Sequence, residues 1–102
     1  MVSVKIGPNE RGMDQVDESW VNQEIHRYRR GGESVCVRVR IDTPSMSISL
    51  ITPGCGGGGG GGGALNPAEH HAVDLWRRHR LGTMEFTGGN LVAFLHELRR
   101  ML

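Results

Sequence analysis

Eight consecutive glycines, Gly56 to Gly63, follow Cys55 and separate a strand-like segment from a helix-like segment. Glycine runs have no side chains to pack and are among the most flexible linkers a chain can contain. The tract therefore predicts a glycine-rich internal loop over residues 54–65. The 102 residues suffice for one modest hydrophobic core, so residues 1–102 are expected to form a single small domain around that loop.

Three short segments alternate apolar and polar residues, as strands with one buried face do. Residues 2–6 read VSVKI, residues 35–41 read VCVRVRI and residues 46–50 read MSISL. The last two segments flank Asp42-Thr43-Pro44, which favours a turn. They are predicted to form an antiparallel hairpin.

Three further segments have helical patterns. Asp17 to Arg30 has an apolar stripe and ends at Gly31-Gly32, and Asn66-Pro67-Ala68-Glu69 has the residues of a capped helix start. The last helix is predicted to begin near Thr87 or Asn90. The expected fold is α+β, in two layers, with the order β-α-β-β-(glycine loop)-α-α. Helices are expected to cover the apolar face of a three-stranded sheet.

The polar face of this sheet is predicted to carry Lys5, Cys36, Arg38, Arg40 and a row of serines. Antiparallel sheets commonly leave one face in water, and we expect this face to be solvated. Sheets that bind RNA stack bases on aromatic rings, which these positions lack. The formal net charge is only +1, so the composition also does not favour nucleic acid as a partner.

The chain contains two cysteines, Cys36 and Cys55. The first residues lack the apolar stretch of a signal peptide, and no segment has the length of a membrane span. We therefore expect a cytoplasmic protein with no membrane contact and with both cysteines as free thiols, a single disulfide being the alternative.

A glycine-rich turn between a strand and a helix N-terminus can present backbone N–H groups to an anion. The candidate ligand-binding residues are Cys55, Gly56, Gly57, Gly58 and Asn66. A P-loop would end in Gly-Lys followed by Ser or Thr, whereas this tract runs into Ala64. A flexible connector is therefore the favoured interpretation, and an anion-binding loop is the alternative.

Gly54 to Gly63, with a cysteine inside polyglycine, resembles the modified core of heterocycle-containing bacterial peptides, in which a Gly-Cys unit is cyclised to a thiazole. The resemblance implies a modified Cys55. A free Cys55 could also be a nucleophile if His70 or His71 lay beside it. His70 and Asp74 stand four residues apart, but no metal-binding motif accompanies them. We expect no metal and no cofactor.

No set of residues resembles an active site, so catalysis is not favoured. The arginine-rich composition suggests a bacterial origin. The favoured function is a small bacterial protein-interaction or accessory module that binds a protein partner or a second copy. Its candidate anchors are Leu91, Phe94, Leu95 and Leu98, which form one helical stripe. The same stripe could instead be core. Nucleic-acid binding through the C-terminal arginine clusters is a weaker alternative.

Overall fold

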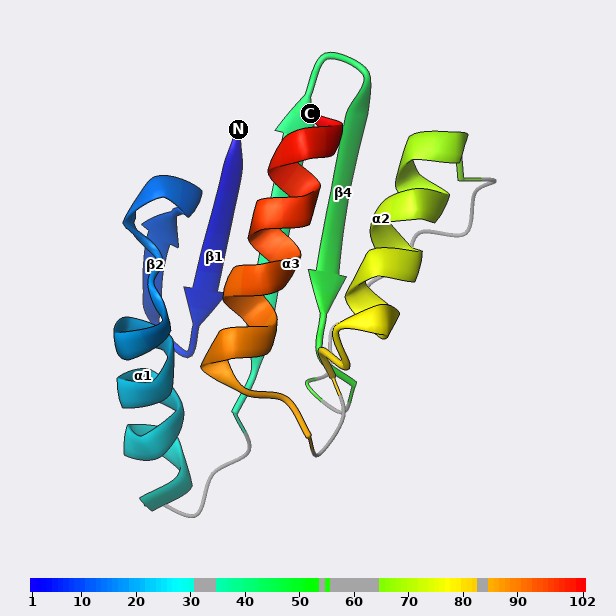
Figure 1. The fold of residues 1–102 in the computed structure, drawn as a ribbon. Helices are drawn as coiled ribbons and strands as arrows, with labels where there is room; N and C mark the ends of the chain where they lie inside the picture. Colours follow the sequence, from blue (N-terminus) through cyan, green and yellow to red (C-terminus); the bar gives the residue numbers. More distant parts are fainter. Residues whose placement is uncertain (31–34, 54, 56–64, 83–84) are drawn as a thin grey trace.

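The computed structural model describes residues 1–30, 35–53, 55, 65–82 and 85–102. Four strands, a short 3-10 helix and three α-helices follow one another along this part of the chain (Figure 1). Their bounds are β1 (Val2–Ile6), β2 (Asn9–Gly12), η1 (Met13–Gln15), α1 (Glu18–Arg30), β3 (Val37–Thr43), β4 (Met46–Ile51), α2 (Pro67–Arg78) and α3 (Gly88–Met101). The domain is α+β, as the sequence predicts.

The sheet is antiparallel with four strands in the order β2-β1-β3-β4, so the predicted three-stranded sheet is wrong by one strand. The extra strand, β2, reads NERG and has no apolar residue to form an alternating pattern. It pairs with β1 through a two-residue turn at Gly7-Pro8. Gly7 has a φ of +58°, a conformation that favours glycine at such a turn. The predicted hairpin of β3 and β4 is confirmed.

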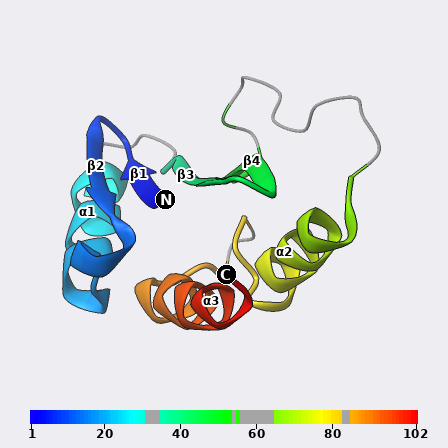
Figure 2. The ribbon, with the colours of Figure 1, turned by 90° about the horizontal axis from the view of Figure 1, so that it is seen from above.

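The three α-helices lie side by side against one face of the sheet, with α3 between α1 and α2 (Figure 2). The buried face of the strands and the inner face of α3 form the centre of the core, and the Trp76 and Phe94 rings meet edge to face at 5.5 Å. Side chains from α3 that are buried there are Leu91, Phe94, Leu95 and Leu98. No helix among the described residues has the length and apolar character needed to cross a bilayer.

The α1 and α3 helices approach closely at Gly88. A Cβ atom at this position would lie 2.5 Å from Asn22 Oδ1, which is shorter than van der Waals contact allows. With glycine there, the Gly88 N–H donates to Asn22 Oδ1 at 3.0 Å.

Asp17 Oδ1 accepts a hydrogen bond from the Trp20 N–H at 2.6 Å at the start of α1, as a capping residue does. The predicted stop at Gly31-Gly32 lies outside the described residues.

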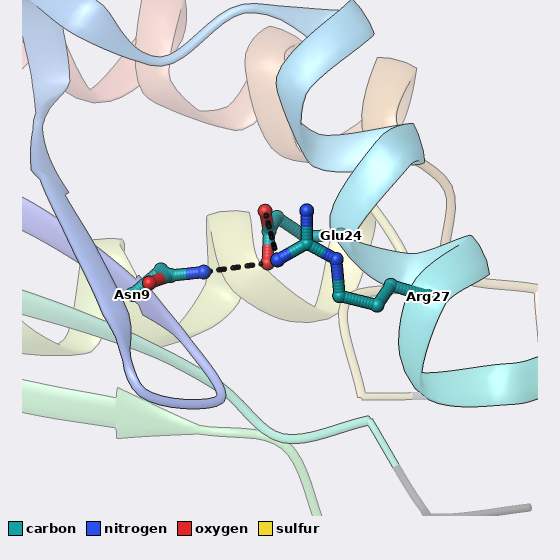
Figure 3. A network of polar contacts seen from close by, with 3 residues as sticks. All are labelled: Asn9, Glu24 and Arg27. Carbon is teal, nitrogen blue, oxygen red and sulfur yellow. Dashed lines mark hydrogen bonds and ion pairs between the residues drawn. The ribbon is translucent and has the colours of Figure 1, made fainter. Parts of the chain in front are cut away.

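The polar network in Figure 3 joins β2 to α1. Glu24 is only 3% exposed, and its Oε2 accepts a hydrogen bond of 2.9 Å from Asn9 Nδ2. Arg27 Nη1 lies 3.6 Å from Glu24 Oε1. Arg11 adds a second contact, because its guanidinium lies 4.7 Å from the centre of the Trp20 ring. Polar contacts therefore hold a strand that has no apolar side chain of its own.

Candidate functional site

The four residues predicted as partner anchors lie in the core of the domain itself. Leu91, Phe94 and Leu98 are fully buried, and Leu95 is 4% exposed. These side chains pack against the protein's own sheet and helices, so the stripe has the structure of a core face. A partner could reach them only if α3 left the sheet.

The two cysteines form a disulfide with a Cα–Cα distance of 5.6 Å, so the prediction of free thiols is wrong. The reason lies in the hairpin register. The Thr52 N–H donates to the Val37 carbonyl at 3.1 Å, which continues the pairing of β3 and β4 by one residue. Cys36 and Cys55 stand just beyond this pair on opposite sides of the hairpin. The thiazole interpretation and the nucleophile interpretation both need the Cys55 sulfur, which the disulfide uses.

The N-terminus of α2 already has its own partners. The predicted capping box is confirmed, because Asn66 Oδ1 accepts from the Glu69 N–H at 2.8 Å and Glu69 Oε1 accepts from the Asn66 N–H at 3.2 Å. Pro67 has no N–H to offer, and the Glu69 carboxylate occupies the positive end of the helix. An anion cradle at Asn66 would have to displace that carboxylate. Gly56, Gly57 and Gly58 lie outside the described residues.

The predicted histidine chemistry has no geometric support in the described part of the chain. His70 and His71 are exposed on α2, and the Cys55 sulfur is bonded to Cys36. Within residues that the structure describes, no three His, Cys, Asp or Glu side chains come together as possible metal ligands.

The face of the sheet opposite the helices, here called the open face, has a basic centre. The strand register places Lys5 directly opposite Arg38 and places Arg40 between Ser3 and Ser49. Lys5, Arg38 and Arg40, here called the basic cluster, are exposed. The other side chains that alternation and register place on this face are Ser3, Glu10, Asp42, Ser47, Ser49 and Ile51.

No ion pair joins the basic cluster to a carboxylate anywhere in the described residues. Glu10 is opposite Lys5 on β2, and Asp42 follows Arg40 by two residues on β3, so acidic side chains flank the basic cluster without forming an ion pair with it. The predicted basic face is therefore present, and its centre has three cations on two adjacent strands.

The C-terminal arginines are arranged differently. Arg78 Nη1 lies 3.8 Å from Glu97 Oε2, and Arg99 Nη1 lies 3.4 Å from Asp14 Oδ1. Arg80 forms an ion pair with Glu85. These ion pairs place a carboxylate next to several of the arginines. The helical surface is therefore less suited to anion binding than the open face.

A cavity of about 180 Å³ lies at one end of the open face, and its walls include two cations and the disulfide. The lining residues that bear on its chemistry are Lys5, Gly7, Cys36, Arg38, Ile51 and Cys55. The cavity therefore combines positive charge with a sulfur–sulfur bond.

Thr52 connects the hairpin to this disulfide. The side chain is buried, and Oγ1 accepts the Val37 N–H at 3.2 Å while lying 3.1 Å from Cys55 Sγ. A disulfide sulfur has no hydrogen, so the Thr52 hydroxyl is the donor to Cys55. Sequence reasoning missed Thr52 and kept the disulfide only as the alternative to free thiols. Extending the hairpin register past β3 would have placed Cys36 opposite Pro53, within two residues of Cys55.

No family model matches the chain, and no curated protein or solved structure shows significant similarity to it. The candidate site therefore rests on the geometry of the open face and on its chemistry.

Proposed function

We propose that this protein is a small bacterial interaction module that binds an acidic segment of a partner protein on its open face. The observation that carries the proposal is the basic cluster, whose side chains lie together on β1 and β3. Carboxylates of a partner would pair with these three cations, which no carboxylate among the described residues joins in an ion pair.

The register of the cluster also supports a binding role. Lys5 and Arg38 are directly opposite each other, and like charges in such a cross-strand pair destabilise a sheet. The carboxylates of an anionic partner would attract both cations and so offset this repulsion. Serine hydroxyls at positions 3, 47 and 49 are hydrogen-bond donors on the same face, and carboxylates accept such bonds.

An acidic protein segment fits this face better than nucleic acid does. Among the described residues of the open face there is no aromatic side chain on which a base could stack. Three cations at the centre are also few for a phosphate backbone, where binding affinity grows with the number of phosphates contacted.

The test is fluorescence anisotropy with a labelled octapeptide of alternating glutamate and serine. Three exposed ion pairs of about 0.5 kcal/mol each predict roughly tenfold weaker binding for the variant Lys5→Gln/Arg38→Gln/Arg40→Gln at low salt. The matched control, Arg29→Gln/Arg30→Gln/Arg100→Gln, removes equal charge at exposed helix positions and should bind within about twofold of the parent.

Equal losses in the two triple variants, or no loss in either, would contradict binding at the open face. A single-stranded oligothymidine provides the competing outcome. If it binds more tightly than the peptide and with a steep salt dependence, the protein recognises nucleic acid and the proposal is wrong. If the peptide does not bind to the parent, the acidic-segment proposal fails directly.

We also propose that the protein works in the cytoplasm, which cell fractionation checks. Disulfides that occur in that compartment are usually transient and have catalytic or redox-sensing roles. This location would therefore give the Cys36–Cys55 disulfide a reactive role in addition to a structural one.

A further inference from the structure

We propose that the Cys36–Cys55 disulfide is a site of thiol–disulfide exchange with small anionic thiols. The inference does not depend on the acidic partner segment proposed above. It rests on three observations together: the position of the disulfide in the wall of a cavity, the two cations that share that wall, and the hydroxyl that donates to one of the sulfurs.

Access to the disulfide comes from the cavity. Cys36 and Cys55 are both partly exposed, and both line the cavity of about 180 Å³. This volume is more than tenfold the roughly 10–15 Å³ that one water needs on the same measure, so the cavity admits a small thiol such as 3-mercaptopropionate.

The charge of the cavity selects the thiol. Lys5 and Arg38 both line it, and their strand pairing places them side by side. A cationic cavity raises the local concentration of anions, and it also favours the thiolate, which is the attacking form of a thiol. Small thiols with a carboxylate should therefore react faster, per thiolate, than neutral or cationic thiols.

The Thr52 hydroxyl distinguishes the two sulfurs. An incoming thiolate attacks Cys36 Sγ and forms a new sulfur–sulfur bond, the Cys36–Cys55 bond breaks, and its electron pair leaves on Cys55 Sγ. The Thr52 hydroxyl, 3.1 Å from this sulfur, donates a hydrogen bond to the leaving thiolate. Exchange through Cys36 is therefore favoured over attack on Cys55.

A second small thiolate completes the reaction. It attacks the small-molecule sulfur of the mixed disulfide, releases the Cys36 thiolate and forms the small-molecule disulfide. The two protons of the small thiols then protonate the two cysteine thiolates. Two thiols are oxidised to one disulfide and the protein disulfide is reduced to two thiols, so atoms and electrons balance.

The test compares three small thiols of different charge: 3-mercaptopropionate, 2-mercaptoethanol and cysteamine. The oxidised protein is mixed with each thiol, samples are quenched with acid and alkylated, and intact mass gives the rate per thiolate. At low salt the anionic thiol should react about tenfold faster than the cationic thiol. The variant Lys5→Gln/Arg38→Gln should bring this ratio close to one.

Arg40→Gln is the matched control, because Arg40 lies on the open face but does not line the cavity. Arg40→Gln should leave the ratio of the anionic to the cationic thiol's reaction rate unchanged. It should weaken binding of the acidic peptide, and this difference separates the two proposals. A wild-type ratio near one, a ratio that the double variant does not change, or an equal loss in Arg40→Gln would overturn the inference. Thermal melts of the oxidised variants check that each is folded.

Peptide mapping of the trapped mixed disulfide tests the role of Thr52. The small thiol should be found on Cys36 in the parent and in Thr52→Ser, which retains the hydroxyl. In Thr52→Val the preference for Cys36 should fall. A thiol attached mainly to Cys55 in the parent would contradict the direction of attack that the hydroxyl predicts.

Discussion

Arg80 adopts a left-handed backbone conformation at the end of α2, with a φ of +57°. The Leu81 N–H donates to the Trp76 carbonyl at 3.1 Å, and the Arg80 N–H donates to the Arg77 carbonyl at 2.9 Å. This pair of bonds is the Schellman pattern, in which the left-handed residue is usually glycine. The helix therefore ends at Arg78, two residues before the left-handed position.

We predict that Arg80→Gly is about 1 kcal/mol more stable than Arg80→Ala, since only glycine avoids the cost of the left-handed conformation. Both variants lose the ion pair with Glu85, so their difference isolates the backbone effect. Urea unfolding of the two variants measures it. Equal stabilities would show that the conformation at residue 80 carries no such cost.

At the scale of elements, the disulfide closes the β3–β4 hairpin beyond its last paired residues. The two cysteines are 19 residues apart in sequence, and a loop of this length predicts about 3 kcal/mol of stabilisation through the entropy of the unfolded chain.

We therefore predict that Cys36→Ala/Cys55→Ala is about 3 kcal/mol less stable than the oxidised parent. Reductant should destabilise the parent by a similar amount and leave the double variant unchanged. Urea unfolding with and without reductant measures both effects. A loss well below about 1 kcal/mol would indicate that the cross-link hardly constrains the unfolded chain.

The elements with a regular pattern are the ones that the sequence predicts. The β1, β3 and β4 strands alternate cleanly, and α2 begins at a complete capping box. The β2 strand has no such pattern. Asn9 and Arg11 instead attach it to α1 through contacts with Glu24 and the Trp20 ring. Contacts between segments that are distant in sequence stabilise this strand, and such contacts cannot be read from the local sequence.

The candidate site follows the same division. The basic cluster follows from alternation along β1 and β3, since every second residue faces the same side. The disulfide needs the register of the hairpin, which the position of its turn at Pro44-Ser45 sets. The apolar stripe of α3 shows a third case: its pattern requires burial but does not say whether the domain or a partner provides it.

At the scale of the whole molecule, the two faces of the sheet have different surroundings. All three α-helices cover one face of the sheet (Figures 1 and 2). The opposite face holds the basic cluster and the cavity with the disulfide. The apolar core and the proposed binding surface thus lie on opposite sides of one sheet. Substitutions on the open face can change binding with little effect on the core.

The most direct test of this account is a titration of the ¹⁵N-labelled protein with the glutamate–serine octapeptide, followed by NMR. Binding at the open face should produce amide shift changes that concentrate on β1, β3 and β4, around Lys5, Arg38 and Arg40. Changes concentrated on the exposed face of α3 around His96 and Arg100, or no changes at all, would contradict binding at the open face.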